Sequence, residues 1–166
     1  MSVDCIIEDR RWAEANIVQI AVAAYQSTMR HLGYDPDQFE IGLLACDDEK
    51  IAELNIQFRD KPVPTNVLSW PSEERGAEVE GAKPEPVIQM MQGDTFLGDV
   101  AIAYDTCAKE AAESDKPLKS HATHLLVHGT LHLLGYDHER DGDATLMEGL
   151  ETQILETMGI ADPYAQ

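Results

Sequence analysis

Apolar positions along the chain follow two different periods, which predicts interleaved strands and helices. Short apolar runs bounded by polar or turn residues are typical of strands, whereas apolar residues spaced three or four apart are typical of helices. The expected strands are 3–7, 39–46, 67–70 and 97–104. The expected helices are 11–32, 49–58, 105–113, 117–134 and 143–158. This interleaving indicates an α+β or mixed α/β class, and we expect α+β with a small mixed sheet packed with helices.

The segment 71–93 departs from both periods. It is rich in Pro, Gly and Glu, which predicts an exposed acidic loop without chemistry of its own that does not touch the metal site, ending in a short strand at 87–90. No repeat or linker divides the rest of the sequence. Because 166 residues suit one domain, we expect a single domain over 1–166.

The charge balance is strongly acidic, with 31 Asp and Glu against 12 Lys and Arg and a net charge of −19. This argues against a protein that coats nucleic acid by general attraction, because phosphate binding needs a basic surface. A local basic patch remains compatible with it. There is no apolar run of membrane-spanning length, and the first residues do not resemble a secretory signal. We therefore expect no membrane association and a cytoplasmic location.

A histidine cluster is the strongest chemical signal in the sequence. Residues 121–138 read HATHLLVHGTLHLLGYDH and contain five of the six histidines. His128 and His132 are one helical turn apart, so both rings can reach one ion. His138 can join them if the chain reverses at Gly135, because glycine adopts the left-handed conformation that ends helices. Three histidines leave one tetrahedral position for water, as in catalytic zinc sites.

A zinc ion there would lower the pKa of its bound water and polarise the bond under attack. The second ring nitrogen of each ligand needs an acceptor, for which Asp137, Asp141 and Asp143 are the candidates. His121 and His124 share the helix face and could line a substrate groove, although core or solvent roles are equally compatible. The surrounding helix is apolar on nearly every side, so we expect a central, buried, metal-bearing helix.

The spacing H-x-x-x-H-x-x-G-x-x-H is also that of metzincin peptidases. Those enzymes place a glutamate directly after the first histidine as general base. Gly129 occupies that position here, which weakens a metallopeptidase interpretation.

The stretch HGTLHLLGYDH resembles the signature of the YbeY family, bacterial endoribonucleases of ribosomal RNA maturation. Two further blocks resemble the family in the same order, the first spanning Leu54-Asn55, Phe58-Arg59 and 64–69, and the second spanning 97–102. The resemblance implies an α+β fold, zinc held by His128, His132 and His138, and cleavage of single-stranded RNA. It also implies roles in 16S rRNA 3′-end processing and ribosome quality control, with the ribosome or its assembly proteins as partners.

The resemblance also assigns Arg59 to the active site, because Arg59 matches an arginine of the family's second block. Such a guanidinium could clamp a phosphate through two parallel hydrogen bonds; the alternative is a solvated arginine at a helix end. Trp70 stands where the family usually has phenylalanine. Three hypotheses therefore remain: a zinc-dependent endoribonuclease, a metallopeptidase-like zinc hydrolase, and a ribosome-assembly factor with a structural metal.

Overall fold

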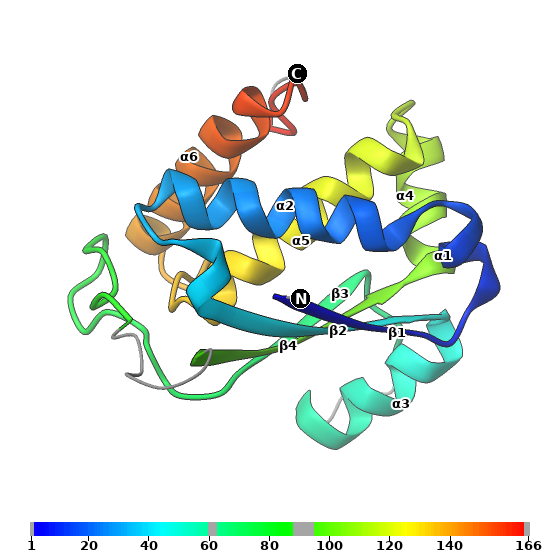
Figure 1. Ribbon diagram of the computed structural model, residues 1–166, viewed down its shortest axis with the longest axis horizontal. Coiled ribbons are helices and arrows are strands. Elements are labelled where there is room, and N and C mark those ends of the chain that lie inside the picture. Colours follow the sequence, from blue (N-terminus) through cyan, green and yellow to red (C-terminus); the bar gives the residue numbers. More distant parts are fainter. Residues whose placement is uncertain (1, 60–62, 88–94, 165–166) are drawn as a thin grey trace.

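A four-stranded sheet carries the helices of this chain (Figure 1). The computed structural model describes residues 2–59, 63–87 and 95–164, without the side chains of residues 58 and 59. Its strands are β1 Val3–Ile7, β2 Phe39–Cys46, β3 Val67–Pro71 and β4 Thr95–Ala103. Its helices are α1 Arg10–Glu14, α2 Ile17–His31, the short 3₁₀ helix η1 Pro36–Gln38, α3 Asp48–Arg59, α4 Tyr104–Glu113, α5 Leu118–Leu133 and α6 Asp141–Thr157.

The sheet is mixed, with the strand order β1-β2-β4-β3. β1 and β4 each pair with β2 in parallel, and β3 pairs with β4 in antiparallel fashion. The α+β class with a small mixed sheet is therefore confirmed. The first two strands begin and end at the predicted residues, because each is a short apolar run with polar residues at both ends. Residues 88–90 of the strand expected at 87–90 lie outside the described residues.

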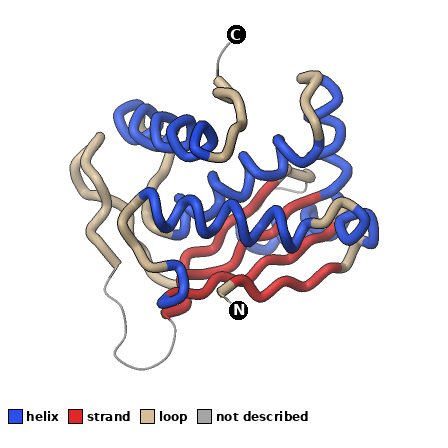
Figure 2. The backbone as a smooth tube through the Cα atoms, turned by 45° about the horizontal axis from the view of Figure 1, so that its top comes forward, coloured by secondary structure: helices blue, strands red, loops and turns tan. Residues whose placement is uncertain are grey.

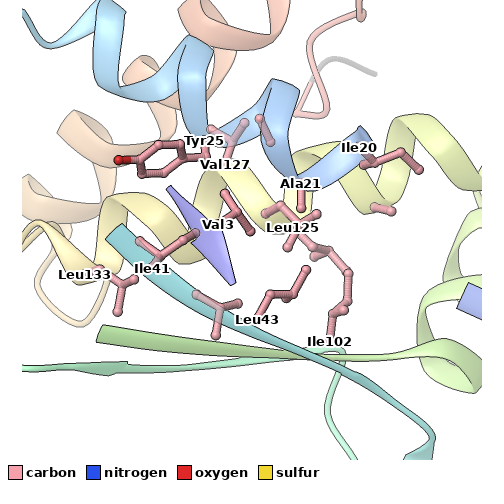
Figure 3. Packing of buried hydrophobic residues seen from close by; sticks show 14 of the residues in the cluster. Val3, Ile20, Ala21, Tyr25, Ile41, Leu43, Ile102, Leu125, Val127 and Leu133 are labelled. Carbon is pink, nitrogen blue, oxygen red and sulfur yellow. The ribbon is translucent and has the colours of Figure 1, made fainter. Parts of the chain in front are cut away.

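Helices cover the two faces of the sheet unequally (Figure 2). α2 and α5 pack on one face, and Figure 3 shows Tyr25 and Val127 from these helices beside Val3, Ile41 and Leu43 of the strands. α3 covers part of the opposite face, where a smaller apolar cluster forms. Its buried members are Cys46, Ile51, Leu68, Ala101 and Ala103. None of the described helices is long and apolar enough to cross a membrane.

The helix predicted over 11–32 is wrong in one respect, because it is interrupted near its start. Asn16 adopts the left-handed conformation, with φ 60° and ψ 45°, between α1 and α2. Asparagine tolerates this conformation better than most residues. The break lets α1 bury Trp12, whose indole N–H donates to the carbonyl of Cys46 at 3.0 Å, while α2 crosses the sheet. Apolar spacing alone did not reveal the change of direction.

α5 is the central helix of the fold. It packs against α2, α4, α6, β3 and β4, and it buries most of its residues, as the all-round apolar pattern predicted. Gly129 lets the sheet approach closely. A Cβ atom at this position would lie 3.0 Å from Cγ1 of Val100 and 3.3 Å from the hydroxyl oxygen of Ser69. The histidines of α5 are thereby fixed on the most constrained helix of the molecule.

Candidate metal centre

The three histidines of the H-x-x-x-H-x-x-G-x-x-H stretch lie together in space. The Nε2 atoms of His128 and His132 are 3.0 Å apart on successive turns of α5. The ring centre of His138 is 5.2 Å from that of His128 and 5.1 Å from that of His132. One ring nitrogen from each residue lies within 4.8 Å of the other two. These residues could therefore hold one metal ion.

The turn after α5 brings His138 back toward the helix. The amide of Gly135 donates to the carbonyl of His132, and the amide of Tyr136 donates to that of Leu131. This is the Schellman arrangement, which needs a left-handed residue after the helix. Gly135 supplies it with φ +106°, and a Cβ atom there would also collide with the backbone of Arg75. Glycine is thus required at this position for conformation and for space.

The protonation of His132 suits a metal ligand. Burial lowers the pKa of His132 to about 4, and charge repulsion from His128 and His138 acts in the same direction. The ring is therefore neutral at neutral pH and keeps a lone pair on one nitrogen. A metal ion needs such a neutral imidazole.

Glu151 of α6 orients the ring of His128. Its carboxylate is fully buried, and Oε1 accepts a hydrogen bond from Nδ1 of His128 at 2.9 Å. Since an ionised carboxylate can only accept, Nδ1 of His128 carries a proton, and Nε2 is the ring atom that faces His132. Burial opposes ionisation of Glu151, but hydrogen bonds from His124 and His128 outweigh it and hold the pKa of the carboxyl at about 2.

For His128, the acceptor is Glu151 and none of the three aspartates that the sequence suggested. Asp137 instead accepts from the amide of His138, and Asp143 accepts from Arg140 and from the amide of Gly81. No local sequence signal marks Glu151, because it is one of many acidic residues and lies far from His128 along the chain. The one indirect indication was that Glu151 lies among apolar residues on one face of the predicted last helix.

The donor set fits zinc by its chemistry. Zinc accepts imidazole nitrogen at about 2.0–2.1 Å, which separates the nitrogens of a tetrahedral site by about 3.4 Å. The spacing of the His128 and His132 nitrogens is already close to this value. The buried carboxylate on the far side of His128 completes the His–carboxylate pairing that accompanies metal-bound histidine. The alternative is a hydrogen bond between the rings of His128 and His132. It would not explain why the ring of His138 lies beside both of them.

A hollow of about 490 Å³ opens beside the three histidines. Residues of and before β3 form one side, and the turn after α5 forms another. The lining residues are Thr65, Asn66, Val67, Leu68, Ser69, Pro71, Glu74, Arg75, Gly76, His128, His132, Gly135, Tyr136, Asp137, His138 and Glu139. His121 and His124 are not among them; His121 bonds to Glu110 and His124 to Glu151. The groove role considered for these two histidines is therefore not supported.

The loop expected to carry no chemistry of its own forms part of the wall of the hollow. Glu74 and Gly76 line the hollow together with His128. Arg75 fixes this stretch by donating to the carbonyls of Leu97 and Leu133 at 3.1 and 2.9 Å. Composition predicted the exposure of the loop correctly but could not show that one arginine anchors it to the end of α5.

The described lining of the hollow is acidic. Glu74, Asp137 and Glu139 contribute carboxylates, and the guanidinium of Arg75 is engaged by two carbonyls and by Ser72. A phosphate would therefore need positive charge from an added cation or from another side chain. The backbone of Arg59 ends α3, a few residues before the segment that lines the hollow. The side chain of Arg59 lies outside the described residues.

The position that carries the general base in metzincins cannot carry a glutamate here. A Cβ atom on Gly129 would point at Val100 and Ser69 in the sheet. A longer side chain would have to displace these two strands from the central helix. The close packing of α5 on the sheet thus opposes the metallopeptidase hypothesis.

The fold and the site together define a class: an α+β protein with a three-histidine cluster, able to hold a metal, on its central helix. Comparison with known proteins refines this class. The model of the family described as Endoribonuclease YbeY matches residues 3–159. The chain therefore belongs to the YbeY family, and this membership supports an endoribonuclease role.

Individual relatives agree with the family assignment. The chain is 52% identical to Endoribonuclease YbeY of Ruegeria sp. (strain TM1040), over 99% of this chain and 96% of the relative. It is 53% identical to Endoribonuclease YbeY of Ruegeria pomeroyi, over 99% and 98% of the two chains. The solution structure of a Thermotoga maritima protein superposes with a TM-score of 0.56 at 17% identity, over 99% of both chains. That last similarity shows the fold alone.

Proposed function

We propose that this chain is a zinc-dependent endoribonuclease that cleaves single-stranded RNA in the cytoplasm. We further propose that it acts in 16S rRNA 3′-end maturation and ribosome quality control, on the ribosome or with its assembly proteins. The observation that carries the proposal is the convergence of His128, His132 and His138 on one point beside an open hollow. Membership of an endoribonuclease family supports the RNA substrate.

His128, His132 and His138 would hold the ion, which supplies Lewis-acid chemistry when bound. Glu151 keeps the proton of His128 on Nδ1 and so directs Nε2 to the site. The burial of His132 keeps that ring neutral. These contacts fix the ligand set before substrate arrives, so little reorganisation is needed during the reaction.

Arg59 is proposed to bind a phosphate of the RNA. Its guanidinium can donate two parallel hydrogen bonds to phosphate oxygens and offset negative charge that develops during cleavage. The acidic lining of the hollow makes such a cation necessary, because Glu74, Asp137 and Glu139 repel the RNA backbone. The same repulsion favours a substrate that enters as a single, flexible strand over a rigid duplex with two rows of phosphates.

The direct test compares cleavage of a single-stranded RNA and of the same sequence in a duplex by purified protein. Chelator-treated protein, His128→Ala and Arg59→Ala run beside the wild type. The proposal predicts cleavage of the single strand only, loss with chelator and with His128→Ala, and recovery of the chelated protein on adding zinc. Cleavage that survives both treatments would reveal a contaminating nuclease. No cleavage by metal-loaded wild type would favour the ribosome-assembly hypothesis.

A further inference from the structure

The segment that follows α6 folds back onto the helix. Gly159 takes a left-handed conformation with φ +77°, and the amide of Ile160 donates to the carbonyl of Leu155 at 2.9 Å. Asp162 then accepts hydrogen bonds from the amide of Tyr164 at 2.8 Å and from the hydroxyl of Thr152 at 3.2 Å. These contacts bring Tyr164 back over the middle of α6.

The hydroxyl of Tyr164 donates to Oε2 of Glu151 at 2.7 Å. The other oxygen of this carboxylate accepts from His124 at 3.0 Å and from His128 at 2.9 Å. The side chain of Glu151 is 0% exposed, whereas Tyr164 is 44% exposed. The tyrosine therefore lies between solvent and a buried anion that contacts a candidate metal ligand.

A buried carboxylate needs a hydrogen bond on each oxygen, because desolvation is costly and water is excluded. Tyr164 donates to Oε2, and the two histidines share Oε1. With both oxygens occupied, the carboxylate plane is fixed. Without the tyrosine hydroxyl, Oε2 loses this hydrogen bond, and the plane of the carboxylate is no longer fixed.

We propose that Tyr164 is a positioning residue of the metal centre, which acts through Glu151 to hold His128 with Nε2 toward the ion. This inference rests on the proposed ligation by His128, His132 and His138. It gives a role in the metal centre to the segment after α6, whose Tyr164 does not line the hollow. Groups that hydrogen-bond a metal-bound histidine, as Glu151 does His128, affect metal affinity by roughly 10- to 100-fold.

The test measures zinc affinity of the full chain by competition with a chromophoric chelator. Tyr164→Phe keeps the ring, which packs edge-on against His124 with 5.6 Å between ring centres, and removes only the hydroxyl. We expect this variant to bind zinc about tenfold more weakly and Glu151→Gln to bind it up to about 100-fold more weakly. Tyr34→Phe is the matched control, because it loses one hydroxyl contact, to the amide of Val87, and should bind zinc as the wild type does.

A second measurement follows the ring of His128 directly. In metal-free wild type, ¹⁵N chemical shifts should report His128 with its proton on Nδ1. In Tyr164→Phe, we expect an increased share of the Nε2–H form and an unchanged circular dichroism spectrum, which separates positioning from loss of structure. In the Co²⁺-loaded protein, the visible absorption bands should shift in Tyr164→Phe and not in Tyr34→Phe.

The outcomes distinguish this inference from the proposed function. Wild type that binds no zinc contradicts the metal centre itself and, with it, any role for Tyr164. Wild type that binds zinc, together with a Tyr164→Phe variant of equal affinity and equal His128 tautomer, contradicts only the role of Tyr164. Weaker binding by Tyr34→Phe to the same degree would show a general effect on stability and would also overturn the inference.

Discussion

The Nε2 atoms of His128 and His132 face each other at 3.0 Å across one turn of α5. A hydrogen bond between the rings and joint ligation of one cation are both compatible with this spacing, but only ligation also involves His138. The proposed cation, held by these atoms and His138, fits this spacing. The following predictions test this account and the structures that support it.

Removing one ligand should abolish tight zinc binding. His132→Ala leaves two imidazoles, and we expect a loss of at least about 100-fold in zinc affinity, because each ligand bond is a large part of the binding energy. His121→Ala is the matched control on the same helix, since His121 contacts Glu110 and not the cluster. Chelator competition measures both. Equal losses in the two variants would contradict the assignment of His132.

The metal-free protein should lose stability in mild acid. The pKa of His132 is about 4 in the folded protein, below the ordinary value of about 6.5. Between these values the unfolded chain binds a proton that the folded chain does not, so stability falls as the pH decreases from about 6.5 to about 4. We expect a loss of about 2 kcal/mol between pH 7.5 and pH 5 from this group.

Urea unfolding of chelated protein at the two pH values measures this loss. In His132→Gln the loss should largely disappear, whereas His31→Gln, at an exposed residue of α2, should leave it unchanged. An identical pH dependence in wild type and His132→Gln would show that another group is responsible.

Replacing Gly135 should disturb the fold and the centre together. Gly135→Ala forces a left-handed conformation on alanine and brings its Cβ atom into the backbone of Arg75. We expect a destabilisation of about 1–3 kcal/mol and weaker zinc binding, because His138 follows this turn. Gly149→Ala on α6 has open space around it and should be neutral or stabilising by up to about 1 kcal/mol. Similar unfolding curves for the two variants would contradict this account.

The hydrogen bonds by which Arg75 holds the loop should not be needed for metal binding. Arg75→Met removes the hydrogen bonds to the carbonyls of Leu97 and Leu133. We expect faster proteolysis within 72–87, with zinc affinity retained, because Arg75 contacts none of the three histidines in the described hydrogen bonds. Lys109→Met, at an exposed residue, serves as the control. Unchanged proteolysis would show that the contacts of Arg140 with residues 77 and 78 suffice to hold the loop.

The acidic wall should weaken RNA binding. Glu74→Gln removes one negative charge from the lining of the hollow, so we expect a lower KM for single-stranded RNA with little change in kcat. Because salt screens such repulsion, the difference should shrink as ionic strength rises. Glu113→Gln, an exposed change on α4, should have a smaller effect. A higher KM in Glu74→Gln would instead indicate that Glu74 binds a group of the substrate.

Local patterns predicted those parts of the fold that depend on neighbours in sequence. The sequence correctly placed the helix that carries His128 and the strands at 3–7 and 39–46. Each of them has a clear apolar periodicity and is bounded by a polar or turn residue. The bend at Asn16 was missed, since its cause is the burial of Trp12 against a distant strand. The part of the site within α5 and the turn after it, which is His128, His132 and His138, was predicted from the same local signals.

The rest of the site depends on contacts between distant segments. Glu151 reaches His128 from another helix, and Tyr164 reaches Glu151 from the segment after it. Glu74 reaches the hollow because Arg75 binds the end of α5. No spacing rule connects these residues, and charge alone suggested the nearer aspartates in place of Glu151. Only three-dimensional packing identifies which carboxylate is buried.

The central claim is that three imidazoles share one metal ion with a free coordination position. X-ray absorption at the zinc edge, on protein purified without added metal, tests it most directly. The account predicts about one zinc per chain, with a shell of three imidazole nitrogens and one further light atom at about 2.0 Å, and loss of one imidazole contribution in His138→Ala. A metal-free protein, a sulfur-containing shell, or a spectrum unchanged by His138→Ala would contradict it.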